Sequence, residues 1–275
     1  MNFKAIYLTC SLILISSTAS ALELCGEPIQ GEIIFGRAEN AEKILFNNNK
    51  IPLSDNGDFL IAFSRDDKLS HTIAVKSSDN KQELPLKINT QKWDIQNIKG
   101  LPQKKVTPSK EDQKSIDRER NDIRGAQKDI TMQELWKSGF IKPVEGRISG
   151  KFGGQRIMNG EKRNPHMGLD IAAPEGTDIK SSSDGIIALA GKDYFYSGNV
   201  VVINHGHGLF TIYAHMKDIS VKKGDKIKQG DVIGTVGKTG RATGPHLHWG
   251  ASLNGTRFDP SSLLKMNNRN LCFTL

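Results

Sequence analysis

The chain has 275 residues, of which 25% are charged, and a formal net charge of +8. This length suits two domains with buried cores, and the basic balance indicates attraction to an anionic surface such as a cell wall or lipid headgroups. The composition argues against a nucleic-acid-binding protein, because the sequence has no tight basic block with interleaved aromatic residues.

The first 21 residues have the pattern of a secretory signal peptide. Lys4 precedes an apolar run at residues 5–15, and small residues follow as far as Ala21. A short positive start, a short apolar stretch and a small-residue site predict cleavage after Ala21. An uncleaved membrane anchor is the alternative, although an anchor needs about twenty apolar residues. We therefore expect an exported protein, periplasmic or associated with the cell wall.

Two of the three cysteines, Cys25 and Cys272, remain after the predicted cleavage. In an oxidising compartment an even number of cysteines favours a disulfide, which here would tie the two ends of the mature chain together. Two unpaired thiols are the alternative, because two cysteines carry no spacing signature.

Residues 22–99 are expected to form a small N-terminal module resembling a β-sandwich. Short runs rich in Ile, Val and Phe alternate with turn residues, a spacing typical of an antiparallel sandwich. Strands are expected at residues 31–37, 43–53, 58–64, 71–77 and 84–88. The module has no catalytic pattern, and its lone His71 is predicted to be a surface or packing residue.

Residues 100–139 are predicted to be a linker that contains a charged helix. Proline and lysine are frequent at its start, and residues 109–127 have a helical pattern that Ser109 could cap. Ile116 and Ile123 give this helix only a thin apolar stripe. Its dense charge is therefore interpreted as a solvated face rather than a binding tract.

Residues 140–265 are expected to form a second all-β domain, and residues 266–275 a C-terminal tail. Glycine becomes frequent here, and turn signals separate short apolar runs. Strands are expected at residues 185–191, 199–205, 209–215, 226–237 and 246–253. The whole chain is therefore predicted to be all-β, apart from the charged helical linker.

Histidine and aspartate side chains gather in two short stretches of this second domain. His166 and Asp170 are four residues apart, so in an extended stretch both side chains lie on one side of the backbone. His246 and His248 likewise share one face of their predicted strand, while Leu247 points toward the core.

A further histidine, His215, ends the strand predicted at residues 209–215. Alternation places His215 with Thr211 and Tyr213 on the more polar face of the strand. Tyr213 could therefore line a groove, although packing is the commoner role for a tyrosine in a strand. His205 and His207 flank a glycine turn and are interpreted as turn residues without a metal role.

Imidazole and carboxylate groups are the ligands that zinc takes when thiols are absent. Three protein ligands with an open fourth position are typical of a catalytic site, since bound water can lose a proton there near neutral pH. The five candidate groups are more than such a site needs. The remaining histidines could act as acid, base or oxyanion stabiliser, and the residues alone leave that division open.

These stretches resemble the zinc metallopeptidases of the lysostaphin and LytM family. The resemblance covers about residues 145–262 and rests on H-M-G-L-D at 166–170, "GLFTIYAHM" and "TGRATGPHLHWG", in the family's order. It implies a mostly antiparallel β-sheet with a groove. Members of this family hydrolyse peptide bonds in the peptide bridges of bacterial peptidoglycan.

The resemblance also implies a role for each candidate residue. His166, Asp170 and His248 match the ligands of one zinc ion, and His215 and His246 match the two non-ligand histidines of the active site. The sequence thus predicts an exported zinc-dependent endopeptidase that acts on peptidoglycan. The N-terminal module and the charged helix could lie over its groove and inhibit it.

Two alternatives come from other classes of protein. The first is a non-enzymatic regulator or wall-binding module, because some relatives have lost ligands and activate amidases. The intact ligand set argues against it. The second is a carrier domain, because residues 221–237 look like the hairpins of biotinyl and lipoyl domains. Glycine-aspartate turns can explain that similarity by themselves.

Overall fold

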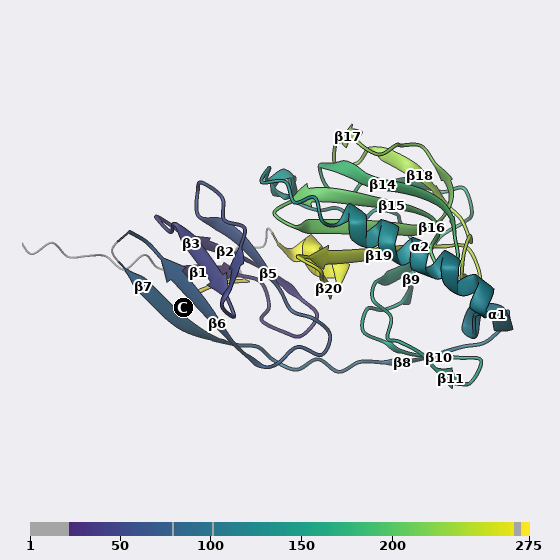
Figure 1. The fold of residues 1–275 in the computed structure, drawn as a ribbon, viewed down its shortest axis with the longest axis horizontal. Coiled ribbons are helices and arrows are strands. Elements are labelled where there is room, and N and C mark those ends of the chain that lie inside the picture. The colour runs from purple at the N-terminus through teal and green to yellow at the C-terminus, as the bar shows by residue number, and fades with distance from the viewer. Residues whose placement is uncertain (1–21, 79, 101, 267–270) are drawn as a thin grey trace, which may run out of the picture.

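The computed structural model describes residues 22–78, 80–100, 102–266 and 271–275, so the predicted signal peptide at 1–21 lies outside the described residues. The chain is mostly β-strand, as predicted, with two small sheets at one end and a large sheet at the other (Figure 1). Within these ranges, no helix has the length and apolar content needed to cross a membrane.

The N-terminal module consists of two four-stranded antiparallel sheets with the orders β21-β1-β2-β5 and β4-β3-β6-β7. Their strands are β1 (Leu22–Cys25), β2 (Ile33–Ala38), β3 (Lys43–Phe46), β4 (Asn49–Ile51), β5 (Asp58–Ala62), β6 (Ser70–Lys76), β7 (Lys81–Lys87) and β21 (Cys272–Thr274). Ile34, Phe59 and Ile73 from both sheets share one buried core, as in a sandwich. His71 is buried there and stacks on Phe46, a packing role.

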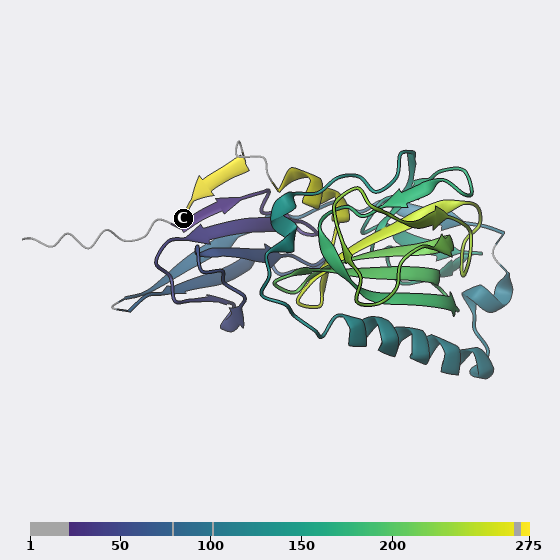
Figure 2. The same cartoon turned by 90° about the horizontal axis from the view of Figure 1, so that it is seen from above.

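The C-terminal residues, expected to be a tail, instead complete the first sheet of this module. Strand β21 pairs with β1 (Figure 2), and Cys25 is directly opposite Cys272 in the register. The two residues form a disulfide, which confirms the predicted pairing and excludes the unpaired thiols. The bond closes a loop with a sequence separation of 247 residues.

We expect the double variant Cys25→Ser, Cys272→Ser to lose about 2–4 kcal/mol of unfolding free energy, because the closed loop restricts the unfolded chain. Urea denaturation of the two proteins measures this difference. A reductant should lower the midpoint of the wild-type protein and leave the variant unchanged. Equal midpoints for the two proteins without reductant would contradict the prediction.

The large sheet has the order β17-β14-β15-β16-β19-β12-β9, and β13, β18 and β20 pair at its sides. Its strands are β9 (Arg147–Gly150), β12 (Leu169–Ala172), β13 (Asp178–Lys180), β14 (Gly185–Tyr194), β15 (Gly198–Gly206), β16 (Leu209–Ile219), β17 (Lys226–Ile227), β18 (Val232–Val236), β19 (His246–Leu253) and β20 (Thr256–Phe258). Tyr213, Trp249 and Phe258 are fully buried in its core. The central strands therefore form a rigid platform for the polar side chains on the opposite face.

A third, small sheet connects the two parts of the chain. Its order is β11-β10-β8, with β8 (Ile95–Ile98) parallel to β10 (Gln155–Met158) and β11 (Glu161–Lys162) antiparallel to β10. Strand β8 follows the N-terminal module in sequence, whereas β10 precedes the first histidine stretch. The strand that follows the module is thus hydrogen-bonded to the segment that leads into the candidate site.

The predicted charged helix is α2 (Lys110–Ala126), and Ser109 caps it in a capping box with Asp112. The other helices are α1 (Gln103–Val106), η1 (Leu135–Ser138) and η2 (Pro260–Lys265). Helix α2 lies across the face of the large sheet (Figures 1 and 2). The helix is therefore not solvated on all sides, because Ile116 and Glu119 are buried against the sheet domain.

Glu32 is buried where the N-terminal module meets the large-sheet domain. Burial raises its pKa to about 7, although the nearby Lys265 opposes the shift. The native state therefore holds the proton more tightly than the unfolded state, whose glutamate has a pKa near 4.3. Between these two values the free energy of unfolding should fall as pH rises.

The variant Glu32→Gln should lack this dependence, because the amide does not titrate. Between pH 4.5 and 8 we expect the wild-type protein to lose on the order of 3 kcal/mol more unfolding free energy than the variant. Urea denaturation at the two pH values measures the difference. Parallel pH profiles for the two proteins would contradict it.

Candidate active site

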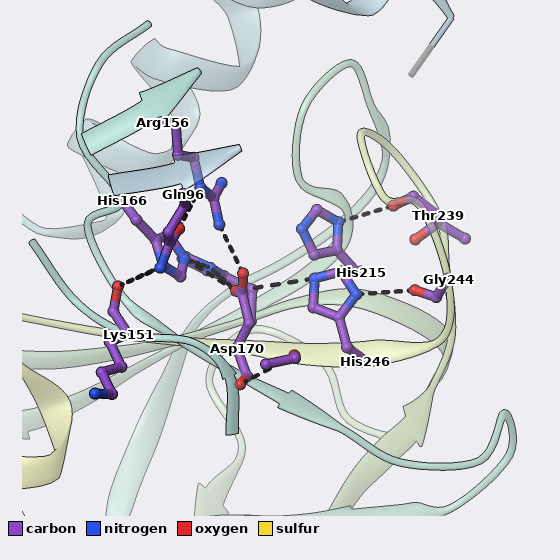
Figure 3. Close-up of polar contacts among 11 residues, drawn as sticks. Gln96, Lys151, Arg156, His166, Asp170, His215, Thr239, Gly244 and His246 are labelled. Atoms are coloured by element: carbon purple, nitrogen blue, oxygen red, sulfur yellow. Dashed lines mark hydrogen bonds and ion pairs between the residues drawn. The ribbon is translucent and has the colours of Figure 1, made fainter. Parts of the chain in front are cut away.

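The three side chains predicted as metal ligands, those of His166, Asp170 and His248, converge at the large sheet. Figure 3 shows His166 beside Asp170. His166 Nε2 lies 3.0 Å from Asp170 Oδ1 and 3.0 Å from His248 Nδ1. His248 Nδ1 lies 2.8 Å from Asp170 Oδ1. Asp170 on β12 is directly opposite His248 on β19 in the antiparallel register, so the sheet itself fixes this pair.

The orientation of the His166 ring is set by the main chain. Its Nδ1–H donates to the carbonyl of Lys151 at 3.0 Å (Figure 3). In the neutral ring, Nε2 then carries a lone pair that faces the carboxylate of Asp170. Two acceptor atoms 3.0 Å apart repel unless a cation or a proton lies between them. This arrangement is the one expected of a metal-ligating histidine held by an outer carbonyl.

The pKa shifts of His248 and Asp170 favour the protonation states that a metal requires. Burial lowers the pKa of His248 to about 4, despite the opposing carboxylate of Asp170. Burial alone would raise the pKa of Asp170, but the close ring nitrogens of His166 and His248 outweigh this and hold the pKa well below its usual range. A carboxylate and two imidazoles, one of them neutral at pH 7 by its pKa, form a donor set that suits zinc.

Two glycines allow these side chains to approach one another. A Cβ on Gly168 would lie 2.6 Å from the His248 ring, and one on Gly150 would lie 2.7 Å from Asp170 Oδ2. The middle position of H-M-G-L-D is therefore glycine for lack of space. Sequence analysis placed the ligands in this motif but gave no role to its glycine.

Arg156 on β10 is a site residue that sequence analysis missed. Its Nη2 lies 2.6 Å from Asp170 Oδ2, the oxygen not shared with the histidines. Its Nε donates to Gln96 on β8 at 3.4 Å (Figure 3). Arg156 thus holds the carboxylate in place from a strand that is paired with β8. No local pattern distinguishes this arginine from the other basic residues of the chain.

The two remaining histidines of the constellation, His215 and His246, lie beside the three ligands, with ring centroids 4.7 Å apart. His215 Nδ1–H donates to the carbonyl of Thr239, and His246 Nδ1–H donates to that of Gly244, each at 2.8 Å (Figure 3). In both neutral rings Nε2 is then the nitrogen that can accept a proton. Burial, followed by the charges of neighbouring histidines, lowers the pKa of His215 to about 3.

The strand face predicted for His215 is wrong. The register of β15 and β16 shifts between Tyr213 and Met216, and His215 has φ +63°. This β-bulge turns the histidine to the side of Ile212 and Ala214, which line the groove. Simple alternation cannot anticipate a bulge, and bulges commonly redirect side chains at active sites.

Tyr213 correspondingly lies in the core and not in the groove. It is fully buried, and its hydroxyl is 2.6 Å from Ser182 Oγ. His205 and His207 also stay away from the ligands. His205 bonds to Thr211 and the Asp184 carbonyl, whereas His207 bonds to the Met132 carbonyl. The interpretation of both histidines as structural agrees with these contacts.

A groove of about 850 Å³ opens over the site. His166, His215 and His248 line it from the sheet. Tyr196 and residues 162–165 also line it. Helix α2 and the turn before it line the other side, through Pro108, Ile116, Glu119, Arg120, Ile123 and Arg124. The groove is therefore a polar channel with the histidines on one wall and α2 on the other.

Comparison with known sequences places this site in a defined family. Residues 164–260 match Peptidase family M23. The DD-carboxypeptidase/endopeptidase Mpg of Neisseria meningitidis is 44% identical over 129 residues, 46% of this chain and 30% of the relative. The peptidoglycan DD-endopeptidase ShyA of Vibrio cholerae is 43% identical over 128 residues, 46% of this chain and 29% of the relative. The match thus spans less than a third of these curated relatives.

Among solved structures, a Pseudomonas aeruginosa protein assigned to peptidase M23 is 27% identical, with a TM-score of 0.68. The likeness covers 88% of this chain and 96% of that one, so it extends beyond the large sheet. Fold and comparisons together define a metallopeptidase domain. The chain carries a LytM-type domain of Peptidase family M23, which confirms the resemblance. Residues 221–237 lie within the matched region, which leaves the carrier alternative without support.

Proposed function

We propose that this protein is an exported zinc-dependent endopeptidase that hydrolyses peptide cross-links of bacterial peptidoglycan. The observation that carries the proposal is the convergence of His166, Asp170 and His248 inside an M23 domain. The names of the relatives Mpg and ShyA, both endopeptidases of the DD type, point to a bond between D-amino acids. The predicted signal peptide and the Cys25–Cys272 disulfide favour an oxidising compartment outside the cytoplasm.

The three ligands would hold one zinc ion, with His166 and His248 bound through Nε2 and Nδ1. The ion would supply an acidified water and would polarise the carbonyl of the peptide bond. Arg156 orients the carboxylate of Asp170, because its Nη2 lies 2.6 Å from Oδ2. The residues of the chain therefore provide a preorganised donor set rather than one assembled on binding.

We assign the transfer of protons to His215 and His246. Both rings are fixed through Nδ1, and each presents Nε2 as the nitrogen that takes or returns a proton. One of them would take the proton lost when water attacks and give it to the leaving amine. A protonated ring beside the carbonyl oxygen would also stabilise the charge that develops there. The two rings are only 4.7 Å apart, so both roles are available within one substrate position.

We further propose that α1 and α2 inhibit the enzyme by covering the groove. The Tyr194 hydroxyl donates to Asp122 on α2 at 2.7 Å, and Lys105 on α1 donates to the Phe195 carbonyl at 2.5 Å. Glu119 is buried against the same loop. A peptide strand long enough to span the groove would have to displace this segment. The β-sandwich module, which the sequence also offered as an inhibitor, does not line the groove in the described residues.

The test is to purify the mature protein and to measure its metal content and its action on isolated sacculi. We expect one zinc ion per chain and the release of peptides with newly exposed amino groups. A chelator should stop the release, and added zinc should restore it. The same assay with the zinc-loaded variant Glu119→Lys tests the enzyme with α2 displaced. If sacculi stay intact there as well, the proposal is contradicted.

A further inference from the structure

Glu119 on α2 is held by three hydrogen-bond donors of one loop. Its carboxylate accepts from the N–H of Tyr196 at 2.8 Å and from the N–H of Ser197 at 2.9 Å. The hydroxyl of Ser197 donates to the same carboxylate. The residue is only 6% exposed. Two backbone N–H groups and a hydroxyl around one carboxylate form an anion-binding arrangement.

The donors belong to the metallopeptidase domain, and its own hydrogen bonds hold them in place. The carbonyl of Tyr196 accepts from the N–H of Arg241 at 2.9 Å, and the carbonyl of Ser197 accepts from the N–H of His215 at 2.8 Å. The N–H groups of Tyr196 and Ser197 are thereby presented to the groove. Because Ser197 is bonded to the main chain of His215, the arrangement lies next to the proposed site of reaction.

The charge of the groove favours an anion at this position. The cations that the metallopeptidase domain contributes to the lining are Arg156, Lys162, Arg163, Arg241 and Arg257. Among the described lining residues, Glu119 supplies the one carboxylate, and α2 brings it there. The guanidinium of Arg241 lies 4.2 Å from the ring centroid of Tyr196, beside the donors. When α2 moves away, it takes Glu119, Arg120 and Arg124 with it, and the five cations of the metallopeptidase domain remain in the groove without a carboxylate among the described lining residues.

We propose that the N–H groups of Tyr196 and Ser197 and the hydroxyl of Ser197 form a subsite for a free carboxylate of the peptide substrate. In this structure Glu119 occupies the subsite as a substitute for that carboxylate. The inference rests on the proposed peptidase function. It makes the substrate an anionic peptide, with a free carboxylate within a residue or two of the bond that is cut. It also explains why a charged residue of α2 is buried.

The first test needs no catalysis. In the full chain with Glu119→Ala, acetate should bind and shift the backbone amide signals of Tyr196 and Ser197 in a saturable way. Acetamide should not shift these signals, because it has no charge. Adding Ser197→Ala should weaken acetate binding about tenfold, since one donor is lost. Glu111→Ala, at an exposed acid of the same helix, is the control and should show no acetate shift at these amides.

The second test uses two peptides that differ only in a free carboxylate or its amide near the scissile bond. We expect a KM about ten- to a hundredfold lower for the free carboxylate, at a similar kcat, because the charge-assisted bonds form on binding. Ser197→Ala should narrow the ratio of the two KM values, because the lost hydroxyl binds the free carboxylate and not the amide, whereas any loosening of α2 changes both KM values equally. The experiment can be done with Glu119 in place, so it does not depend on the folding of the alanine variant.

The outcomes separate the two proposals. Acetate binding without cleavage of either peptide would retain the subsite and reject the peptidase function. Cleavage of both peptides with equal KM, or equal shifts from acetate and acetamide, would reject the subsite and leave the peptidase function standing.

Discussion

Replacing His166 or Asp170 with alanine is expected to abolish both zinc binding and peptide hydrolysis. Each change removes one of three donor atoms that lie about 3 Å from one another, and it leaves the other two without a complete site. The Asp170 variant also leaves Arg156 without its carboxylate partner. Zinc content by elemental analysis and peptide release from sacculi should therefore be lost together in both variants.

His246→Ala is the matched control for this prediction. His246 Nε2 lies 3.8 Å from Asp170 Oδ1, beside the ligands rather than among them. We expect the variant to keep its zinc and to lose about a hundredfold in kcat, as is usual when one donor to a developing charge is removed. If His246→Ala empties the site while His248→Ala does not, the assignment of the two histidines must be reversed.

Glu119→Lys is expected to activate the enzyme by about tenfold or more. The change replaces a buried carboxylate with an ammonium group that would face three hydrogen-bond donors and the cations of the groove. If the change lowers the stability of the closed position of α2 by 1.4 kcal/mol, the ratio of open to closed molecules rises about tenfold. The rate of peptide release at limiting substrate measures the effect.

Glu111→Lys provides the control, because Glu111 is exposed on the same helix. It changes the net charge by the same amount, so a general attraction of the protein to the anionic cell wall should rise equally in both variants. We expect Glu111→Lys to leave the rate within about twofold of the wild-type protein. Equal activation by the two variants would show that charge alone, and not release of α2, raises the rate.

The ligands could be predicted from the sequence because the sheet preserves their local spacing. Asp170 and His248 are cross-strand partners, so two motifs that are far apart in the sequence meet through ordinary antiparallel pairing. The helix at α2 was also predictable, since Ser109 and Asp112 form a local capping box. In these cases the physical cause is contained in a few consecutive residues.

The features that sequence analysis missed depend on contacts between distant segments. The side of the strand on which His215 lies follows from a bulge whose register is set by the neighbouring strand. The burial of Glu119 follows from the docking of α2 on the loop at 196–197, and the position of Arg156 follows from the pairing of β10 with β8. Such contacts produce no periodic pattern in the sequence. The charged sequence of α2 therefore predicts a solvated helix, although one side of it is buried.

X-ray diffraction from crystals grown with zinc, measured on both sides of the zinc absorption edge, tests the metal centre most directly. We predict a single anomalous peak bonded to His166 Nε2, Asp170 and His248 Nδ1, with His215 and His246 unbonded beside it. A peak on any other set of side chains, or no peak at these three residues, would contradict the mechanism proposed for this protein.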